Sequence, residues 1–444
     1  MTSEAQIDSF QKANPEVTLL TPTSPEWKNR RATRGHAGQE KKPLGIAIPT
    51  NAQQVAGIVR WAVKNEVDFT VRTGGNDFYG RNAADGALII DMRDINFINV
   101  ADDKTTATIG GGVIAKDMLL KFDEYNLTAP LGNSLEVGYV GWSTIGGYGP
   151  FTGALGMGFE GIVGAEVVNH EGEIVKATDE MLEGLRGMGG NLGIVTSLTI
   201  KVYPKREIVI GMLIFDDSPE TIKAIVSAEE KLTLPKDLNI HHFLIQMPQR
   251  RTFSIVFSWG GSDVEEGKKY LETFTAALPP VKMNTVQQKS LLGHYESLQI
   301  PCLPYGGQRS IYIKELSSGI FDTLMEALKI KPEFANIGWS MKTVIDHEAI
   351  VPNCFGAGSH ILLSFTDMVP EEKYLAEARK WNDWLYEKIR SSGDPAVMEG
   401  SYPALTRPED RTAEQLFGDK WPRAKELKAK FDPSNVFKHA FPKF

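Results

Sequence analysis

Cysteine, long apolar runs and an apolar leader are what this sequence has least of. Its 444 residues include two cysteines, Cys302 and Cys354, so one disulfide is the most it can form. No window approaches the roughly 18 uncharged apolar residues of a membrane-spanning helix. Residues 1–10 carry charges and no apolar core, which argues against a secretory signal. These absences predict a cytoplasmic protein without a membrane partner.

Positive charge and metal-ligand spacing are also lacking. The formal net charge is −8, with no dense run of Lys and Arg, which argues against nucleic acid or an anionic membrane as a partner. The eight histidines show no metal-ligand spacing, so no metal site is expected. His241 and His242 are adjacent on an expected strand and point to opposite faces, so only one of them can line a given cavity.

Glycine, in contrast, is abundant between residues 74 and 193. Ten glycines fall between positions 138 and 164, a density that costs backbone entropy on folding. A flexible linker is the competing interpretation, but Trp142, Tyr148, Phe151 and Phe159 are interleaved, and linkers are poor in aromatic residues. The pattern favours backbone that approaches a large ligand closely or turns with positive φ.

The organisation of the chain changes near Tyr203-Pro204. Residues 1–40 are polar and are expected to form an irregular arm, and apolar periodicity predicts a helix over 52–66 and a strand over 67–71. Residues 205–400 alternate strand and helix patterns typical of a mostly antiparallel sheet backed by helices. The expected fold class is α+β.

Three glycine motifs stand out. Residues 71–80 (VRTGGNDFYG) follow a strand, so their backbone N–H groups can cradle a pyrophosphate to which Arg72 adds charge, although a plain tight turn explains the motif equally well. Residues 140–150 (VGWSTIGGYGP) can pack backbone against a ring system or phosphate. Residues 185–195 (LRGMGGNLGIV) follow a helix and precede a strand, the wrong context for a Rossmann fingerprint, and no Walker A motif is present.

In this order and spacing, the three motifs resemble the flavin-binding domain of the vanillyl-alcohol-oxidase/p-cresol-methylhydroxylase superfamily, and within it the berberine-bridge-enzyme-like oxidases. Further supporting residues are Pro49-Thr50, Asp91–Arg93, Ile109–Gly112 and the tail Lys430–Phe437. The resemblance implies an FAD-binding domain over 1–204 with its core at 43–204, a substrate-binding domain over 205–400, and a C-terminal segment, 401–444, that returns to the FAD-binding domain. The flavin-binding domain would be of the two-part p-cresol-methylhydroxylase type.

Two departures from the family concern the flavin. The histidine that usually follows the first Gly-Gly and bonds to the flavin 8α-methyl group is Asn76 here, and the position of the cysteine that bonds to C6 is about Ser134. FAD is therefore expected to be non-covalent, and the flavin to be a milder oxidant. Asn76 has an alternative interpretation as a turn residue that never touches the flavin.

The resemblance also implies which residues contact FAD. They are Arg72, Thr73, Gly74, Gly75, Asn76, Asp77 and Gly80 in the first motif, then Gly132 and Asn133, then Gly141, Thr144, Gly146, Gly147 and Gly149 in the second motif, Gly161 and Val163, and Gly190, Asn191 and Val195 in the third motif.

In this family, hydride passes from a substrate C–H to flavin N5 while a tyrosine or carboxylate takes a proton. Tyr402 is the first candidate for that base, although the usual Tyr-x-Asn-Tyr pattern is broken after it. Glu399, Tyr312, His360 and Tyr305 are the others. For each tyrosine, a core residue with a satisfied hydroxyl is the competing interpretation.

The function that follows is oxidation of a small secondary metabolite, with molecular oxygen reoxidising the flavin. A redox-neutral cyclase or isomerase using the same pocket is the main alternative. A binding protein that has lost FAD would not need so many costly glycines. A sugar oxidase is less favoured, because the sequence of residues 205–400 does not indicate an open groove rich in polar aromatic residues.

Overall fold

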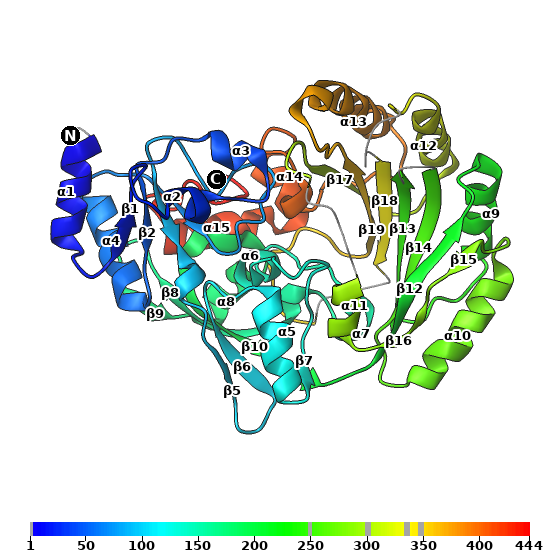
Figure 1. The fold of residues 1–444 in the computed structure, drawn as a ribbon, viewed down its shortest axis with the longest axis horizontal. Coiled ribbons are helices and arrows are strands. Elements are labelled where there is room, and N and C mark those ends of the chain that lie inside the picture. The colour runs from blue at the N-terminus through cyan, green and yellow to red at the C-terminus, as the bar shows by residue number, and fades with distance from the viewer. Residues whose placement is uncertain (1–2, 247–250, 298–302, 333–337, 345–349) are drawn as a thin grey trace.

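The computed structural model describes residues 3–246, 251–297, 303–332, 338–344 and 350–444, so Cys302 lies outside the described residues. Two lobes lie side by side in Figure 1. One lobe contains the N-terminal elements together with the C-terminal helices, and the other contains a large sheet with its covering helices. The mixed α+β architecture expected from the sequence is confirmed.

The first sheet of the N-terminal lobe has the order β1-β2-β4-β3, and its last three strands are parallel. Its strands are β1 (Thr18–Leu20), β2 (Gly45–Ile48), β3 (Phe69–Arg72) and β4 (Leu88–Asp91). Helix α4 (Ala52–Lys64) connects β2 to β3, as the apolar periodicity predicts. It begins at Asn51, whose side chain accepts a hydrogen bond from the Gln54 N–H.

The second sheet is antiparallel, with the order β5-β6-β10-β8-β9. Its strands are β5 (Ile98–Val100), β6 (Thr106–Gly110), β8 (Ile162–Val168), β9 (Ile174–Lys176) and β10 (Ile194–Lys201), and a separate pair joins β7 (Leu127–Thr128) to β11 (Tyr203–Pro204). The helices nearby are α5 (Ala115–Glu124), α6 (Tyr139–Ser143), α7 (Thr152–Leu155) and α8 (Asp179–Met188). The third glycine motif thus runs from the end of α8 into β10.

The expectation of an irregular N-terminal arm is wrong. Residues Ser3–Ala13 form helix α1, followed by the short helices α2 (Trp27–Arg31) and α3 (His36–Glu40). The Phe10 ring is 1% exposed and meets Trp61 of α4 edge-on at 5.0 Å between centroids. Ile7 packs against the same core, and Trp61 Nε1 donates to Ser9 Oγ. One fully buried residue in the helix gives too little periodicity to be recognised in the sequence.

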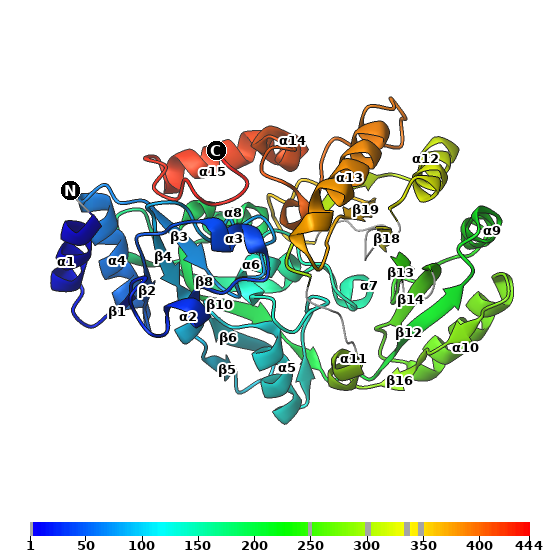
Figure 2. The same ribbon diagram turned by 45° about the horizontal axis from the view of Figure 1, so that its top comes forward.

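The second lobe is built on an antiparallel sheet with the order β15-β12-β14-β13-β18-β19-β17, to which β16 adds by pairing with β12. Its strands are β12 (Ile208–Phe215), β13 (Leu238–Gln246), β14 (Arg251–Trp259), β15 (Met283–Asn284), β16 (Gln287–Lys289), β17 (Gln308–Ile313), β18 (Gly338–Val344) and β19 (His360–Thr366). The helices over this sheet are α9 (Pro219–Glu229), α10 (Val264–Ala277), α12 (Ser318–Lys329) and α13 (Leu375–Arg390). They cover its outer face, and the other face is turned toward the first lobe (Figures 1 and 2).

The tail crosses back to the first lobe through α14 (Ala413–Phe417) and α15 (Trp421–Phe431). In the turn that follows, the buried Asp432 carboxylate accepts the backbone N–H groups of Val436 and Phe437 and the Lys428 ammonium at 2.6 Å. Lys428 also donates to the Asn191 carbonyl at 3.1 Å. The tail is therefore tied to the third glycine motif by a buried, charge-assisted network.

None of the helices in the described ranges combines the length and the apolar composition needed to cross a bilayer.

A buried ion pair joins α9 to the large sheet and gives the fold a pH-dependent element. His242 Nε2 lies 2.9 Å from the Glu229 carboxylate, and the imidazole is fully buried. Burial alone lowers the pKa of His242, but the Glu229 charge, its hydrogen bond and the Met341 carbonyl outweigh burial and raise that pKa.

We expect Glu229→Gln to remove the charge and lower the free energy of unfolding by about 3 kcal/mol at pH 6. Because the pKa of His242 is raised in the folded state, this stabilisation is complete below the ordinary value of about 6.5 and is lost as pH rises through the raised value. Thermal melts of both proteins at pH 6 and pH 9 measure this. A gap between the two melting temperatures that stays constant or widens with pH would contradict it.

Candidate active site

A cavity of about 1590 Å³ lies where the loops of the first lobe meet the uncovered face of the large sheet. It is larger than the roughly 300–1,000 Å³ of an ordinary small-molecule pocket, which leaves room for two ligands side by side. Its walls come from three parts of the chain: glycine loops, alternate residues of the sheet, and the tail segment Phe437–Phe441.

Two glycine loops meet backbone to backbone on the cavity wall. A Cβ atom on Gly74 would lie 2.3 Å from the Gly138 nitrogen, and one on Gly138 would lie 2.3 Å from the Gly74 nitrogen. No side chain fits at either position, since real contacts of Cβ atoms are never that short. The close approach explains in physical terms why the first motif requires glycine at position 74 and why glycine also stands at position 138, just before the second motif.

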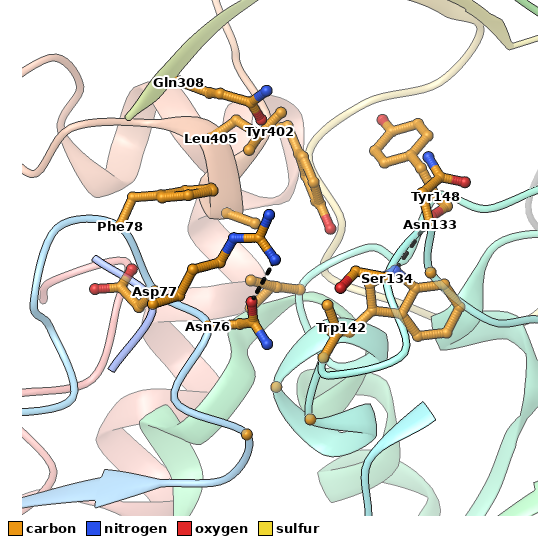
Figure 3. Close-up of a pocket in the computed structure, with 18 of the residues that line it drawn as sticks. Asn76, Asp77, Phe78, Asn133, Ser134, Trp142, Tyr148, Gln308, Tyr402 and Leu405 are labelled. Atoms are coloured by element: carbon orange, nitrogen blue, oxygen red, sulfur yellow. Dashed lines mark hydrogen bonds between the residues drawn. The ribbon is translucent and has the colours of Figure 1, made fainter. Parts of the chain in front are cut away.

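Asn76 and Arg34 connect the same two loops through polar contacts. Asn76 Nδ2 donates to the Glu136 carbonyl at 2.5 Å. Arg34 Nη1 donates to Asn76 Oδ1 at 3.5 Å, the contact marked by the dashed line at Asn76 in Figure 3. Arg34 also lies 3.8 Å from the Glu136 carboxylate and over the Phe78 ring. Asn76 is thus a bridging residue that faces the cavity. Arg34 was missed in the sequence, because it sits in a polar segment without periodicity.

A third contact links the glycine loops to the sheet. A Cβ on Gly149 would lie 1.7 Å from the Leu131 carbonyl oxygen, so these two backbones also touch. Asn239 of β13 donates from Nδ2 to the Gly149 carbonyl at 2.7 Å. The two lobes are thereby joined at the cavity itself.

The cavity brings together many of the FAD contacts expected from the sequence. Those that line it are Thr73, Gly74, Gly75, Asn76, Asp77, Gly132, Asn133, Gly141, Thr144, Gly149, Gly190 and Val195, together with Ser134. Those that do not line it are Arg72, Gly80, Gly146, Gly147, Gly161, Val163 and Asn191.

Arg72 departs most from its expected role. Its side chain is 1% exposed, donates from Nη1 to the Arg30 carbonyl, and lies near Asp91 and Arg93 behind the loop. Burial lowers its pKa to about 10. Successive side chains of a strand point to opposite faces. At the end of β3 this alternation directs the Arg72 side chain into the lobe and away from the cavity.

Three of the other residues outside the lining pack against, or hold, neighbouring backbone. Gly80 packs against the backbone of Gly38, and Gly147 against Gly158. Asn191 donates from Nδ2 to the carbonyls of Met188 and Pro442, so it holds the tail. Val163 is 37% exposed at the surface.

Gly146 lies outside the lining but shapes the wall beside it. Its φ is +137°, and a Cβ there would lie 2.8 Å from the Tyr402 ring. This glycine therefore leaves the space that the ring occupies.

Of the candidate bases, Tyr402 alone lines the cavity, and Figure 3 shows its hydroxyl directed into it. Tyr312 and His360 are buried behind the wall, and Tyr305 stacks on His36 at 4.7 Å between centroids. The Glu399 side chain is exposed and does not line the cavity, so the structure does not support it as the base.

Tyr148, which sequence reasoning treated only as an aromatic residue among glycines, joins the candidates into one cluster. Its hydroxyl oxygen lies 2.5 Å from His360 Nε2 and 3.4 Å from the Tyr312 hydroxyl, and its ring meets Tyr402 edge-on at 4.7 Å. Tyr148 also lines the cavity. The signal in the sequence was a tyrosine inside the second glycine motif, but nothing there indicated that distant strands would pack against it.

Burial raises the pKa of Tyr148 well above its ordinary value, and neighbouring Tyr312 adds to the increase. Burial also raises the pKa of Tyr402, although a hydrogen bond from the Gly147 backbone N–H opposes that shift. Both phenols are therefore neutral at physiological pH, so either accepts a proton only if its own is passed on.

Alternate residues of the large sheet form the opposite wall. Those on the cavity face include Ile210, Met212, Asn239, His241, Phe243, Val256, Ser258, Leu362 and Ser364. Because side chains alternate along a strand, His241 faces the cavity while His242 faces the helices, as the sequence indicates. The wall is mostly apolar with a few separated polar groups, a pattern typical of a site for a small organic molecule.

Comparison with known proteins shows which proteins this chain is similar to. A family model described as an FAD binding domain matches residues 43–178. The chain is 27% identical over 445 residues to the FAD-linked oxidoreductase aurO of Gibberella zeae, covering 97% of this chain and 86% of that protein. It is 30% identical over 193 residues to (R)-6-hydroxynicotine oxidase of Paenarthrobacter nicotinovorans, covering 42% of each.

Among solved structures, BBE-like 1 of Physcomitrella patens superposes with a TM-score of 0.85 at 17% identity, covering 97% of both chains. The likeness in fold extends over both lobes. The chain is therefore an FAD-linked oxidoreductase that contains an FAD binding domain, and its fold is that of BBE-like 1.

Proposed function

We propose that this enzyme oxidises a small, mostly apolar organic molecule of secondary metabolism, using non-covalent FAD that molecular oxygen reoxidises. The observation that carries the proposal is that two buried phenols, Tyr402 and Tyr148, share one cavity with the glycine loops. Oxidation of a C–H next to a hydroxyl or amine needs a hydride acceptor and a proton acceptor close together.

The residues present fit FAD. The glycine loops offer bare backbone on the cavity wall, and the cavity volume of about 1590 Å³ suits a dinucleotide with a substrate beside it. Arg34 Nε is buried without a hydrogen-bond partner among the described residues, so a ligand acceptor there would satisfy it. Residues 73–77, 132–134, 189–190, 193–195 and the tail segment Phe437–Phe441 would hold the cofactor.

Two observations support non-covalent binding. Asn76 stands where a linking histidine would be, and its amide is already engaged by Glu136 and Arg34. Ser134 lines the cavity where a linking cysteine would be, and the described cysteine, Cys354, is buried behind Gly187 and does not line the cavity. An amide and a hydroxyl do not form the bonds that an imidazole and a thiolate form with flavin carbons.

When bound, FAD supplies the two-electron acceptor for the substrate hydride. The sheet wall orients the substrate: Met212, Val256 and Phe243 contact apolar surface, and Asn239, Ser258 and His241 are placed to bind one or two polar groups. The phenols occupy the wall beside the glycine loops and take the proton of the substrate hydroxyl or amine. An aryl or cyclic substrate suits this wall better than a sugar, which needs polar partners along its whole length.

The first prediction concerns how the flavin is attached. The purified protein is expected to be yellow, and acid precipitation followed by centrifugation should leave the colour in the supernatant, because hydrogen bonds and packing are lost on unfolding. Colour that stays in the pellet would contradict non-covalent binding, and peptide mapping would then identify the residue that anchors the flavin. A colourless protein that does not take up added FAD would overturn the proposed function.

The second prediction concerns Asn76. We expect Asn76→Ala to weaken FAD binding about five- to tenfold, because one hydrogen bond across the two loops is lost. The measurement is the FAD dissociation constant from the recovery of flavin fluorescence on dilution. Asn65→Ala is the matched control: it also removes an amide hydrogen bond to a carbonyl, that of Trp61, but far from the cavity. Equal FAD affinity in both variants would show that the Asn76 bridge does not support the cofactor.

The third prediction concerns the substrate. Under anaerobic conditions we expect (R)-6-hydroxynicotine or 4-hydroxybenzyl alcohol to bleach the bound flavin faster than cellobiose, and admitted oxygen to restore the colour with release of hydrogen peroxide. Faster bleaching by cellobiose would favour a sugar oxidase. Conversion of a compound without bleaching or oxygen uptake would favour the redox-neutral cyclase or isomerase.

A further inference from the structure

The cavity contains two phenols, and their surroundings differ in one respect that matters for proton transfer. Tyr402 has a donor at its hydroxyl, the backbone N–H of Gly147. Tyr148 has an acceptor, because His360 Nδ1 lies 2.6 Å from the Gly358 carbonyl. A carbonyl only accepts, so Nδ1 carries the hydrogen and Nε2 presents its lone pair to the Tyr148 hydroxyl at 2.5 Å. The same hydroxyl can also donate to the Tyr312 hydroxyl, but that oxygen is farther away, at 3.4 Å.

We propose that Tyr148 is the catalytic base of this enzyme, and that His360 is the positioning residue that orients the phenol and receives its proton. The inference rests on the proposed function. As the substrate hydroxyl gives its proton to Tyr148 Oη, the original Tyr148 proton moves to His360 Nε2. Bound FAD would supply the acceptor for the substrate C–H hydrogen and its electron pair, so that the substrate alcohol becomes a carbonyl. The balance is one hydride to that acceptor and one proton to His360.

The surroundings of His360 suit a transient positive charge. The Gly358 carbonyl accepts from Nδ1, and this hydrogen bond strengthens when the ring becomes cationic. The Tyr312 ring lies 4.1 Å from the imidazole between centroids, and the Phe355 ring 6.4 Å, near the range at which aromatic faces stabilise cations. His360 is 3% exposed, so the proton does not exchange freely with water during the step.

The relay joins elements that are distant in sequence. Tyr148 follows α6, His360 begins β19 and Tyr312 lies on β17, where it pairs with Leu362 of β19. The titratable groups that contact Tyr148 include His360, Tyr312 and Tyr402. Of the three tyrosines in this cluster, Tyr148 is the one that both lines the cavity and contacts the imidazole through its hydroxyl.

The experiment is the anaerobic rate of flavin reduction by 4-hydroxybenzyl alcohol and (R)-6-hydroxynicotine, measured across pH in the FAD-loaded enzyme. We expect Tyr148→Phe to slow reduction about 10²- to 10⁴-fold with its flavin spectrum intact. Wild-type reduction should fall on the acid side, where His360 already holds two protons. His360→Gln, which accepts a hydrogen bond but not a proton, should be slow and lack that acid limb. Tyr386→Phe, which removes an equally buried hydroxyl far from the cavity, should reduce at the wild-type rate.

Other results separate the possibilities. Slow reduction in Tyr402→Phe with a normal rate in Tyr148→Phe would overturn the relay and leave the proposed function standing, as would an unchanged pH profile in His360→Gln. If no compound reduces wild-type flavin, the proposed function is what fails. The relay then has an independent test: ¹⁵N-histidine spectra, with His360 assigned by His360→Gln, should show the Nδ1–H tautomer at pH 8. An Nε2–H tautomer would overturn the relay.

Discussion

The contact on which the site depends is backbone against backbone, between the loop at Gly74 and the loop at Gly138. Each Cα hydrogen occupies space that a methyl group would need, and each nitrogen would lie 2.3 Å from a Cβ on the other loop. The Asn76 amide and the Arg34 guanidinium connect the two loops only because their backbones are already this close. Through Gly149, which touches Leu131 and accepts from Asn239, the same close packing reaches the large sheet. Glycine loses more backbone entropy on folding than other residues do. At these positions that loss is offset because only glycine lets the two backbones come so close without a side chain filling the cavity wall.

The sequence indicated the cofactor lobe well because glycine is costly and its pattern is local. Motifs of about ten residues, placed after a strand or before one, keep their neighbours in any fold, and Thr73 to Asp77 and Gly149, expected to contact FAD, line one cavity. The direction in which a side chain points was harder to predict. Arg72 belongs to the same motif as Thr73, yet the alternation of side chains along β3 turns it into the lobe. Helix α1 escaped recognition because one buried ring, Phe10, docks it against a partner 51 residues away.

The cluster of side chains around Tyr148 could not be predicted from local sequence patterns, because it is assembled from residues that are distant in the chain. His360 and Tyr312 were proposed as separate candidates, and Tyr402 as the first choice. The structure places all three around Tyr148, which lies more than 160 residues from each of them in sequence. The order of strands in the large sheet, with β17 beside β19, decides which side chains meet at that phenol. No periodicity or motif specifies that order.

The route of the tail has a consequence for biosynthesis. Residues 437–441 form part of the cavity wall, and they are held there by Asp432, Lys428 and Asn191. The glycine loops emerge from the ribosome more than 240 residues before this wall exists, so for most of translation the nascent chain has only an open half-site. The cavity wall is therefore completed only after residues 437–441 have been made, and the contacts of Asp432, Lys428 and Asn191 fasten that last part of the wall to the first lobe.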